Sequence, residues 1–114
     1  MKAWVNVITT FDAAHHLPHY KGKCANVHGH TYKVEVGLCG YVDPRTGMVM
    51  DMTQLKSHVE AVILQLDHKD LNKVIKNPTA ENIAAFLYAE LTEKLSGAGI
   101  RIKVWETPDA YVEF

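Results

Sequence analysis

Residues 31–42 read TYKVEVGLCGYV, and residues 3–11 read AWVNVITTF. In both stretches apolar and polar side chains alternate, and β-branched and aromatic residues are common, as in strands with one covered face. Residues 43–47 (DPRTG) are rich in turn-forming residues, and Met48 to Met50 can continue a hairpin after that turn. The first half of the chain is therefore predicted to consist of paired β-strands.

Two helices are predicted in the second half. Asp51 or Thr53 is a plausible N-cap of the first helix. Its apolar side chains recur at helical spacing at Leu55, Val59, Val62, Ile63 and Leu66. The polar run from Asp67 to Pro78 is expected to be a loop. The second helix begins near Thr79, which with Asn82 resembles a capping arrangement, and Glu81 favours the positive helix start.

Two short strands finish the chain, at residues 100–106 and 110–114, with a turn at Pro108-Asp109. Gly97 and Gly99 are expected to end the second helix before them. The element order is ββααββ, which predicts one α+β domain over residues 1–114. It would have a four-stranded antiparallel sheet with two helices on one face. The outer edges of that sheet would be unpaired in a monomer, so assembly through them is expected.

Composition narrows the class of protein. Apolar residues make up 47% of the chain and the formal net charge is −1, which is typical of a globular protein. Nucleic acid is not expected as a partner, because nucleic-acid-binding domains normally carry a basic excess. No apolar run reaches membrane-spanning length, and no secretion signal is recognisable. Cys24 and Cys39 have no disulfide-framework spacing, which suggests free thiols in a reducing cytoplasm, with Cys39 buried as a small apolar residue.

Three histidines occur where the strand patterns continue: His15 in FDAAHHL, and His28 and His30 in CANVHGH. Strand residues two apart share a face and lie about 7 Å apart. By this parity all three imidazoles lie on the apolar face of the sheet. Three neutral imidazoles without a fourth protein ligand are typical of a catalytic zinc site with one open position.

Ordinary core or surface histidines are the alternative, because the chain has seven histidines and a His-x-His pair alone is a weak signal. The metal interpretation depends on the agreement of three positions. His16 would point to the opposite strand face. His19 and His58 fall in an expected loop and on an exposed helix face, so none of these three is expected to be a ligand.

Four further residues carry groups suited to chemistry. Cys24 lies in a polar loop between lysines and the histidines, where it fits a fourth zinc ligand, a base, or neither. Asp67 and His68 are adjacent at the end of the first helix, where a plain helix-terminal charge pair is an equally good explanation. Glu106 shares the parity of the apolar residues of its strand. Its carboxylate either faces that side and binds a nitrogen heterocycle, or is exposed at a fraying strand end.

Six segments together resemble the 6-pyruvoyltetrahydropterin synthase family: FDAAHHL, CANVHGH, GMVMDMTQLK, LDHKDLN, NPTAENIA and VWET. The resemblance runs nearly end to end, and few other families combine these segments in this order. It implies the tunnelling fold, which matches the predicted element order. It also implies a homo-oligomer, in which three subunits join edge to edge into a barrel and two barrels stack, with active sites at subunit interfaces.

The resemblance also implies residue roles. One Zn²⁺ ion would be the cofactor, held by His15, His28 and His30. The catalytic group would comprise Cys24 as general base, Asp67 and His68 in proton transfer, and Glu106, which also anchors the pterin ring. The remaining substrate-binding positions would be Thr79, Ala80, Asp51 and Lys23. Of these, Thr79 and Ala80 would come from a neighbouring subunit, and Lys23 would attract a triphosphate unless it is a plain solvated charge.

Within the family, the three-residue spacer between Cys24 and the HGH triplet resembles that of the 6-carboxytetrahydropterin synthases, as does Asp51. The implied activity is a zinc-dependent carbon–carbon lyase of queuosine and deazapurine biosynthesis. It would convert 7,8-dihydroneopterin triphosphate to 6-carboxy-5,6,7,8-tetrahydropterin and release acetaldehyde and triphosphate. A 6-pyruvoyltetrahydropterin synthase is the first alternative. A non-catalytic zinc-binding assembly module is the second, and it gives no reason for the four catalytic-type residues to occur together.

Overall fold

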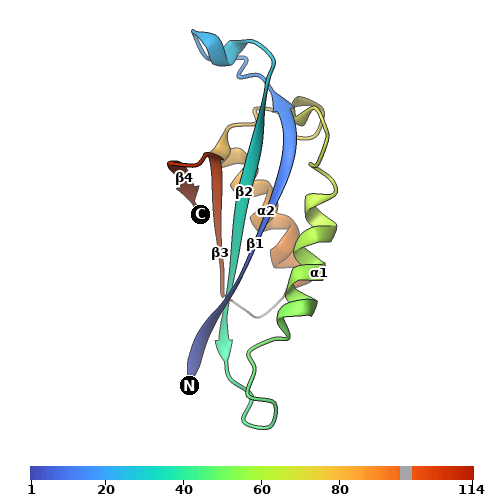
Figure 1. Ribbon diagram of the computed structural model, residues 1–114, viewed down its shortest axis with the longest axis vertical. Helices are drawn as coiled ribbons and strands as arrows, with labels where there is room; N and C mark the ends of the chain where they lie inside the picture. The colour runs from blue at the N-terminus through green and yellow to red at the C-terminus, as the bar shows by residue number, and fades with distance from the viewer. Residues whose placement is uncertain (96–98) are drawn as a thin grey trace.

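The computed structural model in Figure 1 describes residues 1–95 and 99–114. Four strands form one antiparallel sheet in the order β1-β2-β3-β4. Their bounds are Lys2–His15 for β1, His28–Tyr41 for β2, Gly99–Thr107 for β3 and Ala110–Glu113 for β4. The helices are α1 (Met52–Ile63) and α2 (Ala80–Lys94), with two short 3₁₀ turns, η1 (Lys23–Ala25) and η2 (Leu71–Lys73). This order confirms the ββααββ prediction and the α+β class.

Strands β1 and β2 run further than the alternation at residues 3–11 and 31–42 predicted. They pair over their full length, from Lys2 opposite Tyr41 to His15 opposite His28. Pairing continues past the alternating residues because inter-strand hydrogen bonds need only backbone groups. The three candidate ligands therefore lie inside strands, and their face follows from the register.

Both predicted helix caps are present. The Asp51 side chain accepts a hydrogen bond from the Thr53 N–H, and the Thr79 side chain accepts one from the Asn82 N–H. Such bonds satisfy N–H groups that have no partner within the helix. Asp51, and not Thr53, is the N-cap of α1.

Three sequence expectations about the connections were wrong or incomplete. Helix α2 ends at Lys94, and Gly99 opens β3 instead of ending the helix, while Gly97 lies outside the described residues. Residues 48–50 form no hairpin strand, because only one bridge, between Asp43 and Met48, joins the two sides of that turn. The expected loop from Asp67 to Pro78 contains η2.

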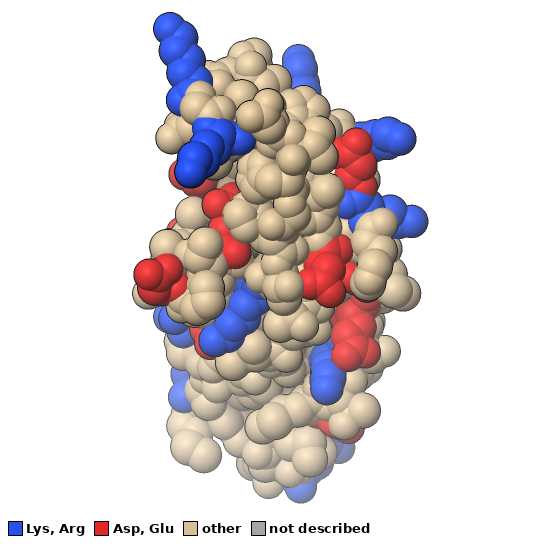
Figure 2. Space-filling model, turned by 45° about the horizontal axis from the view of Figure 1, so that its top comes forward, with Lys and Arg blue, Asp and Glu red and all other residues tan. Residues whose placement is uncertain are grey.

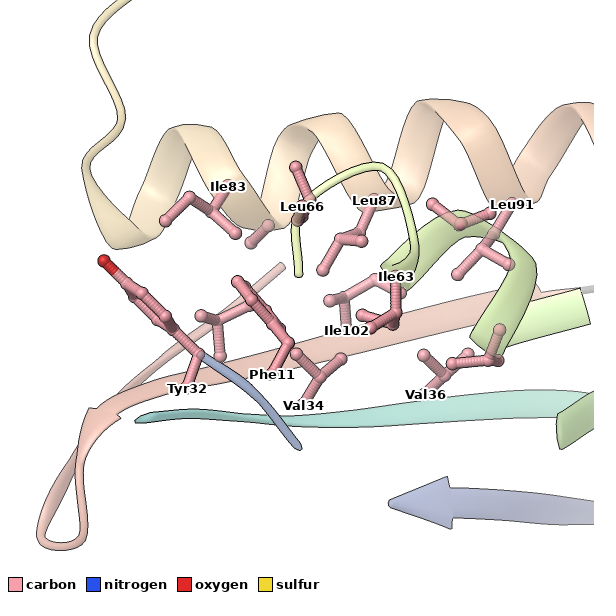
Figure 3. Packing of buried hydrophobic residues seen from close by; sticks show 14 of the residues in the cluster. Phe11, Tyr32, Val34, Val36, Ile63, Leu66, Ile83, Leu87, Leu91 and Ile102 are labelled. Atoms are coloured by element: carbon pink, nitrogen blue, oxygen red, sulfur yellow. The ribbon is translucent and has the colours of Figure 1, made fainter. Parts of the chain in front are cut away.

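Helices and sheet enclose a single cluster of buried apolar side chains, shown in Figure 3. The sheet contributes every second residue of each strand, as the pleat requires. Burying this surface drives folding by roughly 25 cal/mol per Å² of apolar area. The labelled members are Phe11, Tyr32, Val34, Val36 and Ile102 from the sheet, and Ile63, Leu66, Ile83, Leu87 and Leu91 from the helical side.

On the helix-free face of the sheet, cationic side chains lie over aromatic rings. The Arg101 guanidinium lies 4.3 Å from the centre of the Trp4 ring, and the Lys33 ammonium lies 4.6 Å from that of Trp105. Cations at this distance are attracted to the faces of aromatic rings. Cys39 also lies on this face and is only half-buried, so its expected burial in the core was wrong. No helix in the described part of the chain is long and apolar enough to cross a membrane.

Candidate functional site

Five segments meet at one end of the molecule, the top of Figure 1. They are the end of β1, the start of β2, the residues that follow α1, the start of α2 and the end of β3. Two hollows at this end share His30. One, of about 620 Å³, is also lined by His68, and the other, of about 500 Å³, is also lined by Glu106.

The three histidines form a compact group. One ring nitrogen from each of His15, His28 and His30 lies within 4.8 Å of the others. The Nε2 atoms of His15 and His28 are 3.0 Å apart. His15 is 1% exposed, and the other two are half-buried. The shared face predicted from strand parity therefore brings the three imidazoles together.

Backbone carbonyls determine which nitrogens of two rings carry a proton. His15 Nδ1 lies 2.7 Å from the Pro78 oxygen, and His28 Nδ1 lies 2.7 Å from the Asn26 oxygen. A carbonyl only accepts hydrogen bonds, so both Nδ1 atoms must donate, which leaves both Nε2 lone pairs free. Two lone pairs that face each other at 3.0 Å repel unless a cation or a proton lies between them. The donor set thus fits a metal ion, and the outer carbonyls orient its ligands.

Burial at the site shifts the pKa values of His30 and Tyr32 toward their neutral forms. Burial lowers the pKa of His30 below its ordinary value, partly offset by the nearby Glu106 carboxylate, so the neutral form that binds metals is favoured. Burial also raises the pKa of the Tyr32 hydroxyl, which therefore stays protonated. That hydroxyl lies 3.2 Å from His15 Nδ1 and, as Figure 3 shows, it points from the core toward the start of α2.

Asp67 and His68 form a pair beside the histidine group. His68 Nδ1 donates to Asp67 Oδ1 at 3.0 Å, and the Asp12 backbone N–H donates to the same oxygen at 3.0 Å. The Asp12 N–H and, next, the His68 ring hold the pKa of the Asp67 carboxyl below its usual value. Because His68 is turned to Asp67 through Nδ1, its Nε2 is the free end of the ring.

Glu106 ends the row of apolar residues on β3 and is half-buried. It lines a hollow of about 360 Å³ together with Thr79, Ala80 and Glu81 at the start of α2 of the same chain. Thr79 and Ala80 thus lie beside Glu106 within one chain, whereas the family resemblance implied that they come from a neighbouring subunit. The sequence assigned Glu81 only to the helix start. Its place at this hollow depends on the packing of α2 against the distant strand β3, which the helix-start pattern of NPTAENIA does not reveal.

The structure does not bring every expected residue to this end. Asp51 caps α1 at the opposite end of the molecule, where it lines an apolar hollow with Met48, Met50 and Met52. Lys23 is exposed in η1, which lies at the same end as the histidines in Figure 1. Cys24 is half-buried in η1 and is not a member of the three-histidine group. It is therefore near the ligands in sequence without being placed as a fourth donor.

The other expected non-ligands lie outside the group of three. His16 follows β1, and its N–H donates to the Asn72 side chain. His19 is exposed in a turn, and His58 is half-buried on α1, less exposed than its helix position suggested. Figure 2 shows separate basic and acidic side chains over this end, with no large area of one sign on the face in view.

The sheet, the helices and the three facing imidazoles define an α+β protein with a candidate metal centre. The family model described as 6-pyruvoyl tetrahydropterin synthase matches residues 4–114. The chain therefore belongs to the 6-pyruvoyltetrahydropterin synthase family, and it is an enzyme of that family.

Individual relatives carry different activity names. An Archaeoglobus fulgidus protein named as a candidate 6-carboxy-5,6,7,8-tetrahydropterin synthase is 44% identical over 110 residues, covering 96% of this chain and 92% of its own. The dihydroneopterin monophosphate aldolase of Pyrococcus furiosus is 37% identical over 99% of this chain and 97% of its own. The solved 6-pyruvoyl tetrahydropterin synthase of Caenorhabditis elegans superposes with a TM-score of 0.90 at 29% identity, covering 100% of this chain and 95% of that one.

The geometry predicts one transition-metal ion per chain at the three histidines. His28→Ala removes one of three facing nitrogens, so metal content should fall to near zero after dialysis. Elemental analysis of the purified protein measures this. His58→Ala, a change of the same type on α1, should keep the wild-type content, and full metal retention in His28→Ala would contradict the assignment.

Proposed function

We propose that this protein is a zinc-dependent carbon–carbon lyase that converts 7,8-dihydroneopterin triphosphate to 6-carboxy-5,6,7,8-tetrahydropterin, with release of acetaldehyde and triphosphate. The observation that carries the proposal is the convergence of three imidazoles, the Asp67–His68 pair and Glu106 at one end of the sheet. The relative named as a candidate 6-carboxytetrahydropterin synthase supports the same activity.

Zinc is the ion that the donor set favours. Three imidazoles without a fourth protein ligand are the pattern of catalytic zinc sites, and zinc–nitrogen bonds of about 2.0–2.1 Å suit nitrogens close to the 3.0 Å separation of His15 and His28. When bound, zinc supplies Lewis acidity that makes protons next to the substrate's side-chain hydroxyls easier to remove.

The protein's own residues then handle the protons. Cys24, four residues before His28 and beside Lys23, removes a proton from the substrate side chain as its thiolate. His68 exchanges protons through its free Nε2, while Asp67 accepts the hydrogen bond from Nδ1 and keeps the ring oriented. Triphosphate leaves by elimination. One water molecule then adds to the side-chain carbonyl carbon next to the ring, and cleavage of the adjacent carbon–carbon bond leaves the carboxylate on the ring and releases the other two carbons as acetaldehyde.

The pterin ring binds in the hollow between β3 and the start of α2. The Glu106 carboxylate accepts hydrogen bonds from the ring's amino group and the adjacent N–H, and Thr79 and Ala80 line the same hollow. Asp51 lies at the other end of the molecule from this hollow, so it can contact a bound substrate only in an assembly of several copies. We therefore propose a homo-oligomer, joined through the edge strands β1 and β4, that brings Asp51 of a neighbouring copy near the substrate. Lys23, next to Cys24 in η1, attracts the triphosphate.

Two other activities have support and differ in their products. A 6-pyruvoyltetrahydropterin synthase, the name of the C. elegans protein, releases triphosphate and keeps the three-carbon side chain. An aldolase acting on dihydroneopterin monophosphate, the name of the P. furiosus relative, would release a phosphorylated two-carbon aldehyde.

Mass spectrometry of the reaction products tests the proposal. Zinc-loaded protein incubated with 7,8-dihydroneopterin triphosphate should form acetaldehyde and the carboxypterin in equal amounts. Triphosphate release without acetaldehyde would establish the pyruvoyl-forming activity instead. Cleavage of the monophosphate, with no reaction of the triphosphate, would establish the aldolase.

Cys24 is expected to act as a base and not as a required ligand. Cys24→Ala should keep wild-type zinc content and lose turnover by about 10²–10⁴-fold, the usual contribution of a general acid or base. Zinc analysis and steady-state rates measure the two effects, with Cys39→Ala as the matched control. Loss of zinc together with the thiol would show that the site is closed and the mechanism wrong.

Glu106 is expected to bind the pterin ring. Glu106→Gln keeps the shape of the side chain but turns one acceptor into a donor, and hydrogen bonds to charged groups contribute roughly 1.5–3 kcal/mol each. Pterin affinity should weaken by at least about tenfold with zinc content unchanged. Fluorescence titration with a pterin measures it against Glu93→Gln, an exposed change on α2. Wild-type affinity in Glu106→Gln would remove this residue from the binding site.

A further inference from the structure

We propose that Asp12 is a positioning residue for the Asp67–His68 pair, and that its hydrogen bond to Thr31 fixes the short piece of β1 backbone to which both residues are attached. This inference rests on the proposed function, in which His68 exchanges protons with the substrate. The site described so far uses only the backbone N–H of Asp12, and it uses neither the Asp12 side chain nor Thr31.

Both backbone polar groups of Asp12 are used by the pair. Its N–H donates to Asp67 Oδ1 at 3.0 Å, and its carbonyl oxygen accepts from the His68 N–H at 2.6 Å. These two groups lie on either side of the Asp12 Cα atom. The torsion angles of this one residue therefore set where Asp67 and His68 lie relative to each other and to β1.

His68 needs such support because its backbone is in an unfavourable region. Its φ is +58°, the left-handed region that non-glycine residues rarely adopt. Such conformations persist where neighbouring contacts hold them, and they are frequent at functional sites. The bond from the His68 N–H to the Asp12 carbonyl holds the turn, and the ring can then reach Asp67.

The Asp12 side chain ties this piece of β1 to β2. Asp12 lies opposite Thr31, and its Oδ1 accepts a hydrogen bond from the Thr31 hydroxyl at 2.5 Å. Because the backbone groups of Asp12 point outward to residues 67 and 68, they are not available for β2. The side-chain bond is thus the direct polar link between the strands at this pair, and Thr31 is adjacent to the candidate ligand His30.

The same bond keeps the Asp12 carboxylate from disturbing the pair. An Asp12 oxygen lies within 4.8 Å of both an Asp67 oxygen and a His68 ring nitrogen. A free carboxylate at that distance is able to compete with Asp67 for the His68 N–H. The hydrogen bond from the Thr31 hydroxyl engages this carboxylate, which favours the His68–Asp67 bond over that competition.

Four single variants, one double variant and one control test the proposal. Asp12→Ala and Thr31→Val break the link, and each should lower kcat by about tenfold to a hundredfold, because small misplacements of a catalytic group are costly. KM and metal content should change less than twofold, since the pterin hollow and the histidines are untouched. The double variant should be no slower than the slower single variant, because both remove one interaction.

The conservative variants separate positioning from charge. Asp12→Asn keeps the acceptor oxygen and Thr31→Ser keeps the hydroxyl, so both should retain kcat within about threefold of the wild type. Glu60→Gln, an exposed loss of charge on α1, is the matched control. A loss in Asp12→Asn as large as that in Asp12→Ala would overturn the positioning role in favour of a charge effect, and unchanged kcat in Asp12→Ala and Thr31→Val would overturn it altogether.

A measurement without substrate keeps this test independent of the proposed activity. The His68 amide should exchange with deuterium at least about tenfold faster in Asp12→Ala and Thr31→Val than in the wild type, because its bond to the Asp12 carbonyl is loosened. Wild-type protein that fails to turn over dihydroneopterin triphosphate would contradict the proposed function alone. Unchanged amide exchange in both variants would contradict the positioning role alone.

Discussion

The antiparallel pairing of β1 with β2 is the constraint on which the rest of the structure depends. The pairing is unbroken from Lys2 opposite Tyr41 to His15 opposite His28. A slip of one residue would turn every side chain of a strand to the other face. It would expose Phe11 and remove His15 from its partners at the same time. Burial of the apolar core therefore stabilises the same strand register that brings the three histidines together. A change of register would disrupt the core and the histidine group at once.

Tyr32 joins the core to the histidine group. Its ring stacks on Phe11 with centroids 4.8 Å apart, and its hydroxyl lies 3.2 Å from His15 Nδ1. The same nitrogen meets the Pro78 carbonyl, just before α2. The helix start, the sheet and the candidate ligand thus meet at one buried point, which limits how far His15 can move when a metal or substrate arrives.

Most of this fold was predictable from the alternation of apolar and polar residues, because a strand with one buried face has an apolar residue at every second position. The same rule placed the three histidines on one face, and the N-caps at Asp51 and Thr79 followed from short-range hydrogen bonding. The contributions of Asp12 and Glu81 were not predictable. Asp12 acts through peptide groups, which are alike at every residue, and Glu81 matters only through a strand that is distant in sequence. The missed end of α2 shows the same limit, since Gly99 serves the strand and not the helix.

The cation-covered aromatic rings of the helix-free face have an optical consequence. The chain has two tryptophans, and both Trp4 and Trp105 lie on that face beneath Arg101 and Lys33. The buried cluster around Phe11 and Tyr32 contains neither. The tryptophan fluorescence of this protein consequently depends on the solvent and contacts at the helix-free face of the sheet. The buried core contributes no tryptophan emission. If another molecule covers this face, the emission maximum shifts to shorter wavelength, and if the face is exposed to water it shifts to longer wavelength, so no added dye is needed.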